Sequence, residues 1–321
     1  MRFWILRLIA VSLLGSGMGC ATPDPPTASH LMHDQATDPT YRTRDGENFP
    51  YRAWLPSAPP KAVLVAFHGL SGAADDFEPL ADHLVPLGYA VYSPYLRSQG
   101  HDPKLARRGN HRDFQVVVDD FEDFTRYVSE RHPNLPIVEA GESMGAMLLV
   151  HRHARTTVPD SVRAVILFSP VVDLKFEIAP WQRLLFRTLT TVAPGYRTKV
   201  DQVAARQAEK PRMTRDDAYQ QRLDQAPHRL SELSLRFVGG LTRMIEASST
   251  AAAQLNRPVY IAYAGKDLFI EPAQVESFAR AIGSPNVNLQ LYPDSYHLLL
   301  HDYDAGRVLD ELTPWINARI D

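Results

Sequence analysis

The chain has 321 residues and a mass of 36.0 kDa, a length that fits one large α/β domain or two domains of average size. Hydrophobic residues make up 45% and charged residues 22%, so the composition excludes a disordered, collagen-like or coiled-coil chain. Acidic residues exceed basic residues by 37 to 34 without a long basic run, so nucleic acid is not an expected partner. A single cysteine excludes an internal disulfide framework and a multi-cysteine metal site.

The N-terminal segment has the pattern of a bacterial export signal. Residues 1–19 contain two arginines and an apolar run, Leu8 to Leu14, that is too short to span a bilayer. Cys20 follows Gly19 directly, and this arrangement resembles the lipobox of bacterial lipoproteins, in which the cysteine after the cleavage site carries lipid. Acyl chains would partition into a bilayer at about 0.8 kcal/mol per buried CH₂. We expect a lipoprotein of the cell envelope that faces the periplasm; simple secretion or an uncleaved helix is the alternative.

A spacer follows the cysteine. Residues 21–41 are dense in Pro, Thr and Asp and lack apolar periodicity, so residues 20–42 are predicted to be a flexible tether ahead of a domain over 43–321. His30 and His33 lie in this spacer, but no third ligand is arranged with them, and a metal site is not expected.

Beyond the tether, short apolar runs alternate with amphipathic stretches. The runs are rich in β-branched and aromatic residues, as is typical of buried strands. They are residues 62–67, 90–93, 137–140, 165–168 and 259–263. Two sets of apolar residues recur at helical spacing: Val117, Phe121, Phe124 and Val128, and Phe77, Leu80, Leu84 and Leu87. This alternation predicts a mostly parallel central sheet flanked by helices.

One interval is far longer than a crossover helix requires. A structureless loop from Ser169 to Val259 would be uncommon, so we predict a helical cap over about 174–236, between the sixth and seventh strands. Five apolar residues in it have roughly helical spacing: Trp181, Leu184, Leu185, Phe186 and Leu189. They form either the core of the insertion or the inner side of a lid that receives an acyl chain.

The sharpest motif is the stretch from Gly141 to Gly145, GESMG, placed between a strand-like run and a helix-like stretch. In that context a GxSxG sequence makes a turn so tight that side chains at the two glycines would collide with neighbouring backbone. Ser143 is then strained, with its hydroxyl above the sheet and a helix N-terminus beside it. These features favour Ser143 as a nucleophile, and a purely structural turn is the alternative.

A serine nucleophile needs a base in contact and an acid that orients the base. Asp267 follows a predicted strand and His297 follows the next strand-like segment, so nucleophile, acid and base occur in the chain order of α/β-hydrolases. His301 is the alternative base. Asp294 is the alternative acid, although it more readily shapes the turn before the histidine.

Acyl transfer also needs two N–H donors for the oxyanion. The run 62–67 ends in His68-Gly69-Leu70, so the N–H groups of Leu70 and Met144 are the candidate donors, while His68 is expected to fix the loop. No metal or organic cofactor is needed for this chemistry. Two histidines in the helix after the motif are expected on its outer half, outside catalysis: His151 and His153.

The sequence resembles the monoacylglycerol lipase and lysophospholipase branch of the α/β-hydrolases, also described as serine aminopeptidase-like, over roughly residues 51–320. Besides the HG and GESMG motifs, four segments are similar to that family: residues 93–102, 214–227, 264–272 and 291–302. The resemblance implies the α/β-hydrolase fold with a helical cap. It also implies a triad of Ser143, Asp267 and His297, with Leu70 and Met144 as the oxyanion hole.

These observations predict a serine carboxylester hydrolase that cleaves a lipid-like ester through an acyl-enzyme. An aminopeptidase on the same fold is the alternative, and it would need a carboxylate cluster for the substrate ammonium. The cap offers four candidates: Glu177, Asp216, Asp217 and Asp224. A binding lipoprotein without turnover is the non-enzymatic alternative. The sequence makes no prediction of the oligomeric state.

Overall fold

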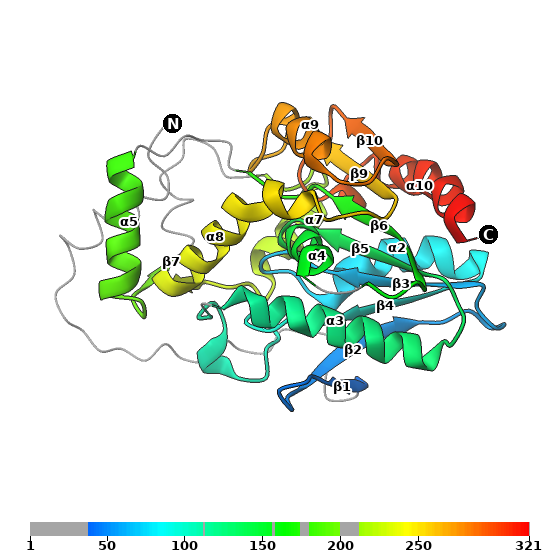
Figure 1. Cartoon of the computed structure of the whole chain (residues 1–321), viewed down its shortest axis with the longest axis horizontal. Helices are drawn as coiled ribbons and strands as arrows, with labels where there is room; N and C mark the ends of the chain where they lie inside the picture. The colour runs from blue at the N-terminus through cyan, green and yellow to red at the C-terminus, as the bar shows by residue number, and fades with distance from the viewer. Residues whose placement is uncertain (1–37, 112, 156–157, 174–179, 200–211, 321) are drawn as a thin grey trace.

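The computed structural model describes residues 38–111, 113–155, 158–173, 180–199 and 212–320. In these residues a central sheet carries helices on both faces, and a smaller group of elements projects from one end (Figure 1). The predicted export signal and most of the tether, including Cys20, His30 and His33, lie outside the described residues.

Eight strands of the described chain form the main sheet, in the order β1-β2-β4-β3-β5-β6-β9-β10. Their bounds are β1 (Thr40–Arg42), β2 (Asn48–Trp54), β3 (Ala62–Phe67), β4 (Tyr89–Pro94), β5 (Ile137–Glu142), β6 (Val162–Phe168), β9 (Val259–Ala264) and β10 (Val287–Tyr292). Only the pairs that involve β2 are antiparallel, and the others are parallel. All five predicted runs lie within these strands, so the mostly parallel sheet is confirmed.

Helices cover both faces of the sheet, and this is why the inner strands β3, β4, β5 and β9 are buried along their whole length. One face carries α3 (Phe114–Arg131), α4 (Met144–Arg155), α8 (Leu235–Ala252) and α9 (Pro272–Ala281). The other carries η2 (Ala74–Phe77), α2 (Glu78–Leu84), η3 (Val85–Leu87), η5 (Leu299–His301) and α10 (Ala305–Ile320). A short turn, η4 (Leu105–Arg107), lies in the loop before α3.

The two predicted helical patterns have different outcomes. Each apolar residue of the first set is buried in α3, whose first turn is capped by Asp113 through the N–H of Gln115. In the second set Leu87 is exposed, because α2 ends at Leu84 and the chain turns at Gly88, where φ is +88°.

The predicted tether is too long at its C-terminal end. Thr40–Arg42 form β1, which pairs with β2, so residues 40–42 belong to the sheet rather than to a tether that ends at residue 42. The physical reason is Tyr41, which is buried with its ring 4.7 Å from that of Phe124. One buried aromatic residue in a three-residue strand leaves no periodicity to detect.

The expectation that His151 and His153 lie on the outer half of α4 is wrong, because α3 and α8 pack beside α4 and each histidine is 6% exposed. His153 Nε2 lies 2.8 Å from Glu139, a buried carboxylate that also accepts bonds from Arg152 and Thr125. Burial alone would raise the pKa of Glu139, but the Arg152 charge and these hydrogen bonds outweigh it and lower the pKa to about 2. His153 is therefore part of a structural network.

The cap lies between β6 and β9, the sixth and seventh strands of the main sheet, as predicted. Its described elements are α5 (Pro180–Val192), β7 (Arg197–Lys199), α7 (Asp217–Gln225) and β8 (Glu232–Ser234), and β7 pairs with β8. Phe186 and Leu189 pack against the start of α8, which fits the core of the insertion. Trp181 and Leu185 are exposed. The side chain of Leu184 lies outside the described residues.

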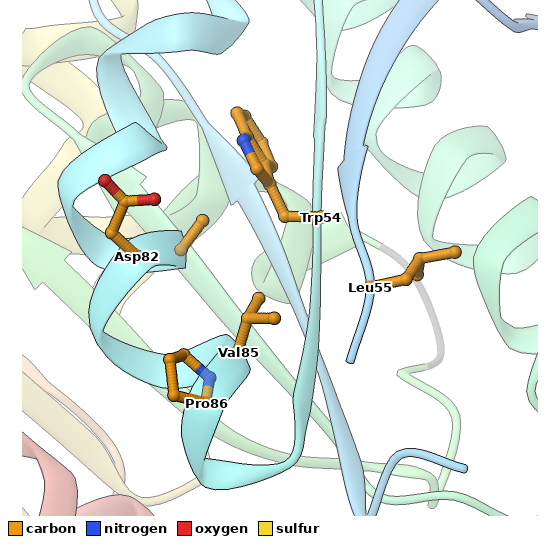
Figure 2. A pocket seen from close by; sticks show the side chains of 6 residues that line it. Trp54, Leu55, Asp82, Val85 and Pro86 are labelled. Carbon is orange, nitrogen blue, oxygen red and sulfur yellow. The ribbon is translucent and has the colours of Figure 1, made fainter. Parts of the chain in front are cut away.

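A small recess lies between the end of β2 and α2 (Figure 2). Six residues line it: Trp54, Leu55, Ala81, Asp82, Val85 and Pro86. Trp54 pairs with Val91, in the first half of β4, so the recess lies toward the amino ends of the parallel strands. As to membranes, none of the helices in the described part of the chain has the length and apolar character of a bilayer span.

Candidate active site

The candidate residues follow strands that end at one edge of the sheet. Gly141 in β5 pairs with Phe67, the last residue of β3, and Phe168 at the end of β6 pairs with Ala262 in β9. β9 and β10 also end in register. The segments after these parallel strands therefore meet at the carboxyl edge, where open α/β sheets place their ligands.

Ser143 lies in the predicted tight turn between β5 and α4. Its φ is +54°, a left-handed conformation that is strained for a residue with a side chain. A Cβ added at Gly141 would lie 2.6 Å from Ala146 Cα, and one added at Gly145 would lie 2.1 Å from the carbonyl oxygen of Phe67. The expected collisions at both glycines are confirmed, and they explain why this turn needs glycine on either side of the serine.

Asp267 and His297 form a buried hydrogen-bonded pair. His297 Nδ1 lies 2.7 Å from Asp267 Oδ2, and the other carboxylate oxygen accepts the N–H of Phe269 at 2.7 Å. A neutral imidazole that donates Nδ1–H to this carboxylate presents Nε2 as the acceptor. None of the described groups bonds to His297 Nε2, so the Ser143 hydroxyl is not hydrogen-bonded to it in this structure. Catalytic hydrogen bonds are often long before substrate binds.

The alternative acid and base are engaged elsewhere. His301 Nε2 lies 2.8 Å from the carbonyl oxygen of Asp76, its ring stacks on Tyr219, and burial lowers its pKa to about 4. Asp294 is exposed and pairs with Lys266 Nζ at 3.2 Å. The structure thus brings Asp267, and not Asp294, to the ring of His297.

The loop after β3 lies against the serine. A Cβ added at Gly69 would lie 3.1 Å from Ser143 Cβ and 3.6 Å from its Oγ. His68 is buried, accepts the N–H of Leu96 at Nε2 (3.2 Å) and holds its proton at Nδ1, 2.9 Å from the carbonyl oxygen of Gly69. Burial lowers the pKa of His68 to about 4, so the ring is neutral and fixes the loop, as expected.

Gln99 joins the two segments that carry the candidate oxyanion donors. Its Oε1 accepts a hydrogen bond at 2.9 Å from the N–H of Ser71, the residue after Leu70. Its Nε2 lies 3.9 Å from Met144 Sδ. Ser71 has a positive φ of +61°, so this bond holds a strained residue. Gln99 lies in the segment 93–102 that resembles the family, but no motif in the sequence marks it as functional.

Glu142 precedes the serine and is buried, with one carboxyl oxygen that bonds to no described group. Burial, and then the nearby Asp76 carboxyl, raise the pKa of Glu142 well above its usual range. This shift favours the protonated, uncharged form of the Glu142 carboxyl beside the serine. As to metals, the described His, Cys, Asp and Glu side chains form no group of three or more suited to an ion.

A strained serine, a buried Asp–His pair and a parallel sheet that ends beside both define a serine hydrolase with the α/β-hydrolase fold. Residues 58–304 match the family described as Serine aminopeptidase, S33, and the chain belongs to this family.

Comparisons with known proteins agree on this fold. The chain is 26% identical over 279 residues to the monoacylglycerol lipase of Mycolicibacterium smegmatis, which covers 86% of this chain and 95% of that protein. A soluble variant of monoglyceride lipase from Saccharomyces cerevisiae is similar in structure, with a TM-score of 0.75 and 21% identity over 92% of this chain and all of that one. A carboxyl esterase from Bacillus coagulans has a TM-score of 0.75 and 17% identity over 89% and 99% of the two chains. The predicted α/β-hydrolase fold is confirmed.

Proposed function

We propose that this serine ester hydrolase cleaves monoacylglycerols into a fatty acid and glycerol. The observation that carries the proposal is the similarity, over nearly the whole of both chains, to a protein named monoacylglycerol lipase. The geometry of the site supports it, because an elbow serine and a buried Asp–His pair are the groups that acyl transfer from an ester requires.

In the proposed reaction Ser143 attacks the ester carbonyl while His297 Nε2 takes the hydroxyl proton. Asp267 holds Nδ1–H and stabilises the imidazolium. The N–H groups of Leu70 and Met144 stabilise the oxyanion, at about 3 to 4 kcal/mol per donor. His297 then protonates the glycerol oxygen, and glycerol leaves. Water attacks the acyl-enzyme while His297 takes a proton from it, and His297 returns this proton to Ser143 Oγ as the fatty acid leaves.

The exposed side of α5 supports a lipid substrate. Trp181, Leu185 and Val192 are exposed at 63%, 38% and 77%, and their spacing places them on one side of the helix. Large apolar side chains gathered on a surface are typical of sites that contact apolar molecules. A cap with this side is suited to take an acyl chain from a lipid phase.

The carboxylates of the cap do not support peptidase activity. Asp216 accepts the N–H groups of Ala218 and Tyr219 and thus caps α7. The other two described candidates bond to neighbouring arginines: Asp217 to Arg212 and Asp224 to Arg229. Glu177 lies outside the described residues. These carboxylates serve local structure and do not converge on a site for a substrate ammonium.

A substrate panel tests the proposed function. Purified enzyme should release fatty acid from monoacylglycerols with the highest kcat/KM, more slowly from lysophosphatidylcholine, and not measurably from aminoacyl anilides. Glycerol and fatty acid should appear in equal amounts. A kcat/KM for aminoacyl anilides above that for every monoacylglycerol would contradict the proposal, since the same triad would then serve a peptidase.

We also propose that Cys20 carries lipid and holds the enzyme at the cell envelope, facing the periplasm. The run before Gly19 and Cys20 supports this location. Bacterial cells that express the full chain should incorporate labelled palmitate into it, and Cys20→Ser should abolish the label and release the protein from membranes. Equal labelling of the Cys20→Ser variant would refute a lipid at this position.

A further inference from the structure

The segment of the cap just before α7, residues 213–215, is joined to the loop that carries His297. Two hydrogen bonds connect these segments. The N–H of Leu298 donates to the carbonyl oxygen of Met213 at 2.9 Å, and the Thr214 hydroxyl donates to the carbonyl oxygen of His301 at 2.5 Å. The bond at Leu298 is one residue from the candidate base. The cap is therefore bonded directly to the loop that carries His297.

Arg215 makes the charged part of this junction. Its guanidinium pairs with the carboxylates of Asp302 and Asp304, the second at 2.7 Å, and its backbone N–H lies 3.1 Å from Asp302 Oδ2. The side chain of Asp302 has no exposed surface. Charge-assisted bonds to a buried carboxylate are stronger than neutral ones and have defined geometry.

Asp302 links Arg215 to the backbone next to His297. Besides Arg215, its Oδ2 accepts the backbone N–H of Tyr296 at 3.1 Å, directly before His297. The ring of His297 is hydrogen-bonded at Nδ1 and packs edge-on against the ring of Phe269, 4.8 Å away between centroids, but no described group bonds to Nε2. The position of Nε2 therefore also depends on the backbone of its loop.

We propose that Arg215 and Asp302 are positioning residues that set His297 relative to Ser143, so that the cap holds the catalytic base in place. The inference rests on the proposed roles of Ser143 and His297. Neither Arg215 nor Asp302 touches the reacting atoms. They act through the backbone of residues 296–298, and a displacement of the cap would therefore move Nε2 away from the serine.

The test compares Arg215→Ala, Arg215→Lys and Asp302→Asn with the parent on a p-nitrophenyl ester. Because a misplacement of about 1 Å can cost about 10²-fold in rate, kcat should fall about 10- to 100-fold in Arg215→Ala while KM stays close to that of the parent. Lysine keeps the charge without the planar fork, so Arg215→Lys should recover part of the loss. Asp302→Asn should resemble Arg215→Ala, and the double variant should lose little more than the worse single variant.

Arg229→Ala is the matched control, because Arg229 also lies in a loop of the cap next to α7 but pairs with Asp224 within the cap. It should keep the parental kcat. Melting curves check that each variant is folded at the assay temperature, and the lysine and asparagine variants decide the question if Arg215→Ala does not fold. The inference is overturned if folded variants keep the parental kcat, or if KM rises with no change in kcat. Absence of fluorophosphonate labelling in the parent would instead defeat the proposed function.

Discussion

Replacing Ser143 by alanine should lower the turnover of ester substrates by about 10⁴- to 10⁶-fold. The hydroxyl is the only group lost, and without it no acyl-enzyme can form. The substitution keeps a Cβ at a position where φ is already +54°, so the turn should persist and the fold should not change. Measured with a p-nitrophenyl ester, the loss should appear in kcat, and fluorophosphonate labelling should disappear.

Ser169→Ala provides a matched control for this experiment. Ser169 also follows a strand at the carboxyl edge, is buried, and has a positive φ of +42°, with an Oγ that bonds to no described group. It should keep activity near that of the parent and retain labelling. If Ser143→Ala released acyl groups at the parental rate, the nucleophile would have to be another residue and the proposed mechanism would fail.

The positions of the candidate triad could be predicted because each depends on local rules. A GxSxG turn between strand and helix needs small flanking residues whatever the rest of the fold does, as the contacts at Gly141 and Gly145 show. Asp267 follows the buried strand β9, His297 follows the edge strand β10, and parallel strands end at a common edge. The order of the segments along the chain was therefore enough to predict that all three end at one edge of the sheet and that Asp267 lies beside His297.

Residues whose roles come from distant partners could not be predicted in this way. Gln99 and Ser71 are bonded across two loops, and Arg215 reaches Asp302 from a part of the chain that is 87 positions away. These residues lie in loops and do not recur at a regular spacing, so no sequence pattern marks them. His153 was assigned to the wrong side of α4 for the same reason, since its partner is buried on β5.

The cap shows a third limit of prediction from sequence: which side of a helix is buried. The spacing of its apolar residues predicted a helix, and α5 is present, but the pattern does not say which side packs. Phe186 turns toward α8 while Trp181 faces outward. Burial on this helix depends on where the rest of the insertion lies, which is a property of tertiary structure rather than of the segment.

Replacing Asp267 by asparagine should lower kcat by about 10⁴-fold while leaving the protein folded. The amide oxygen can still accept the N–H of Phe269, so the loop keeps its geometry. The amide NH₂ then faces His297 Nδ1 and forces that nitrogen to act as an acceptor, which places the ring proton on Nε2. In this tautomer the ring cannot take the proton of Ser143, although all the groups remain in place.

Asp294→Asn tests which of the two candidate acids, Asp267 or Asp294, orients the base. It makes the same chemical change in the turn before the histidine, but Asp294 is exposed and pairs with Lys266. Because an exposed ion pair contributes little to stability, kcat for a p-nitrophenyl ester and the melting temperature should both stay near those of the parent. A loss of kcat in Asp294→Asn together with a parental kcat in Asp267→Asn would mean that Asp294, and not the buried Asp267, orients the base during turnover.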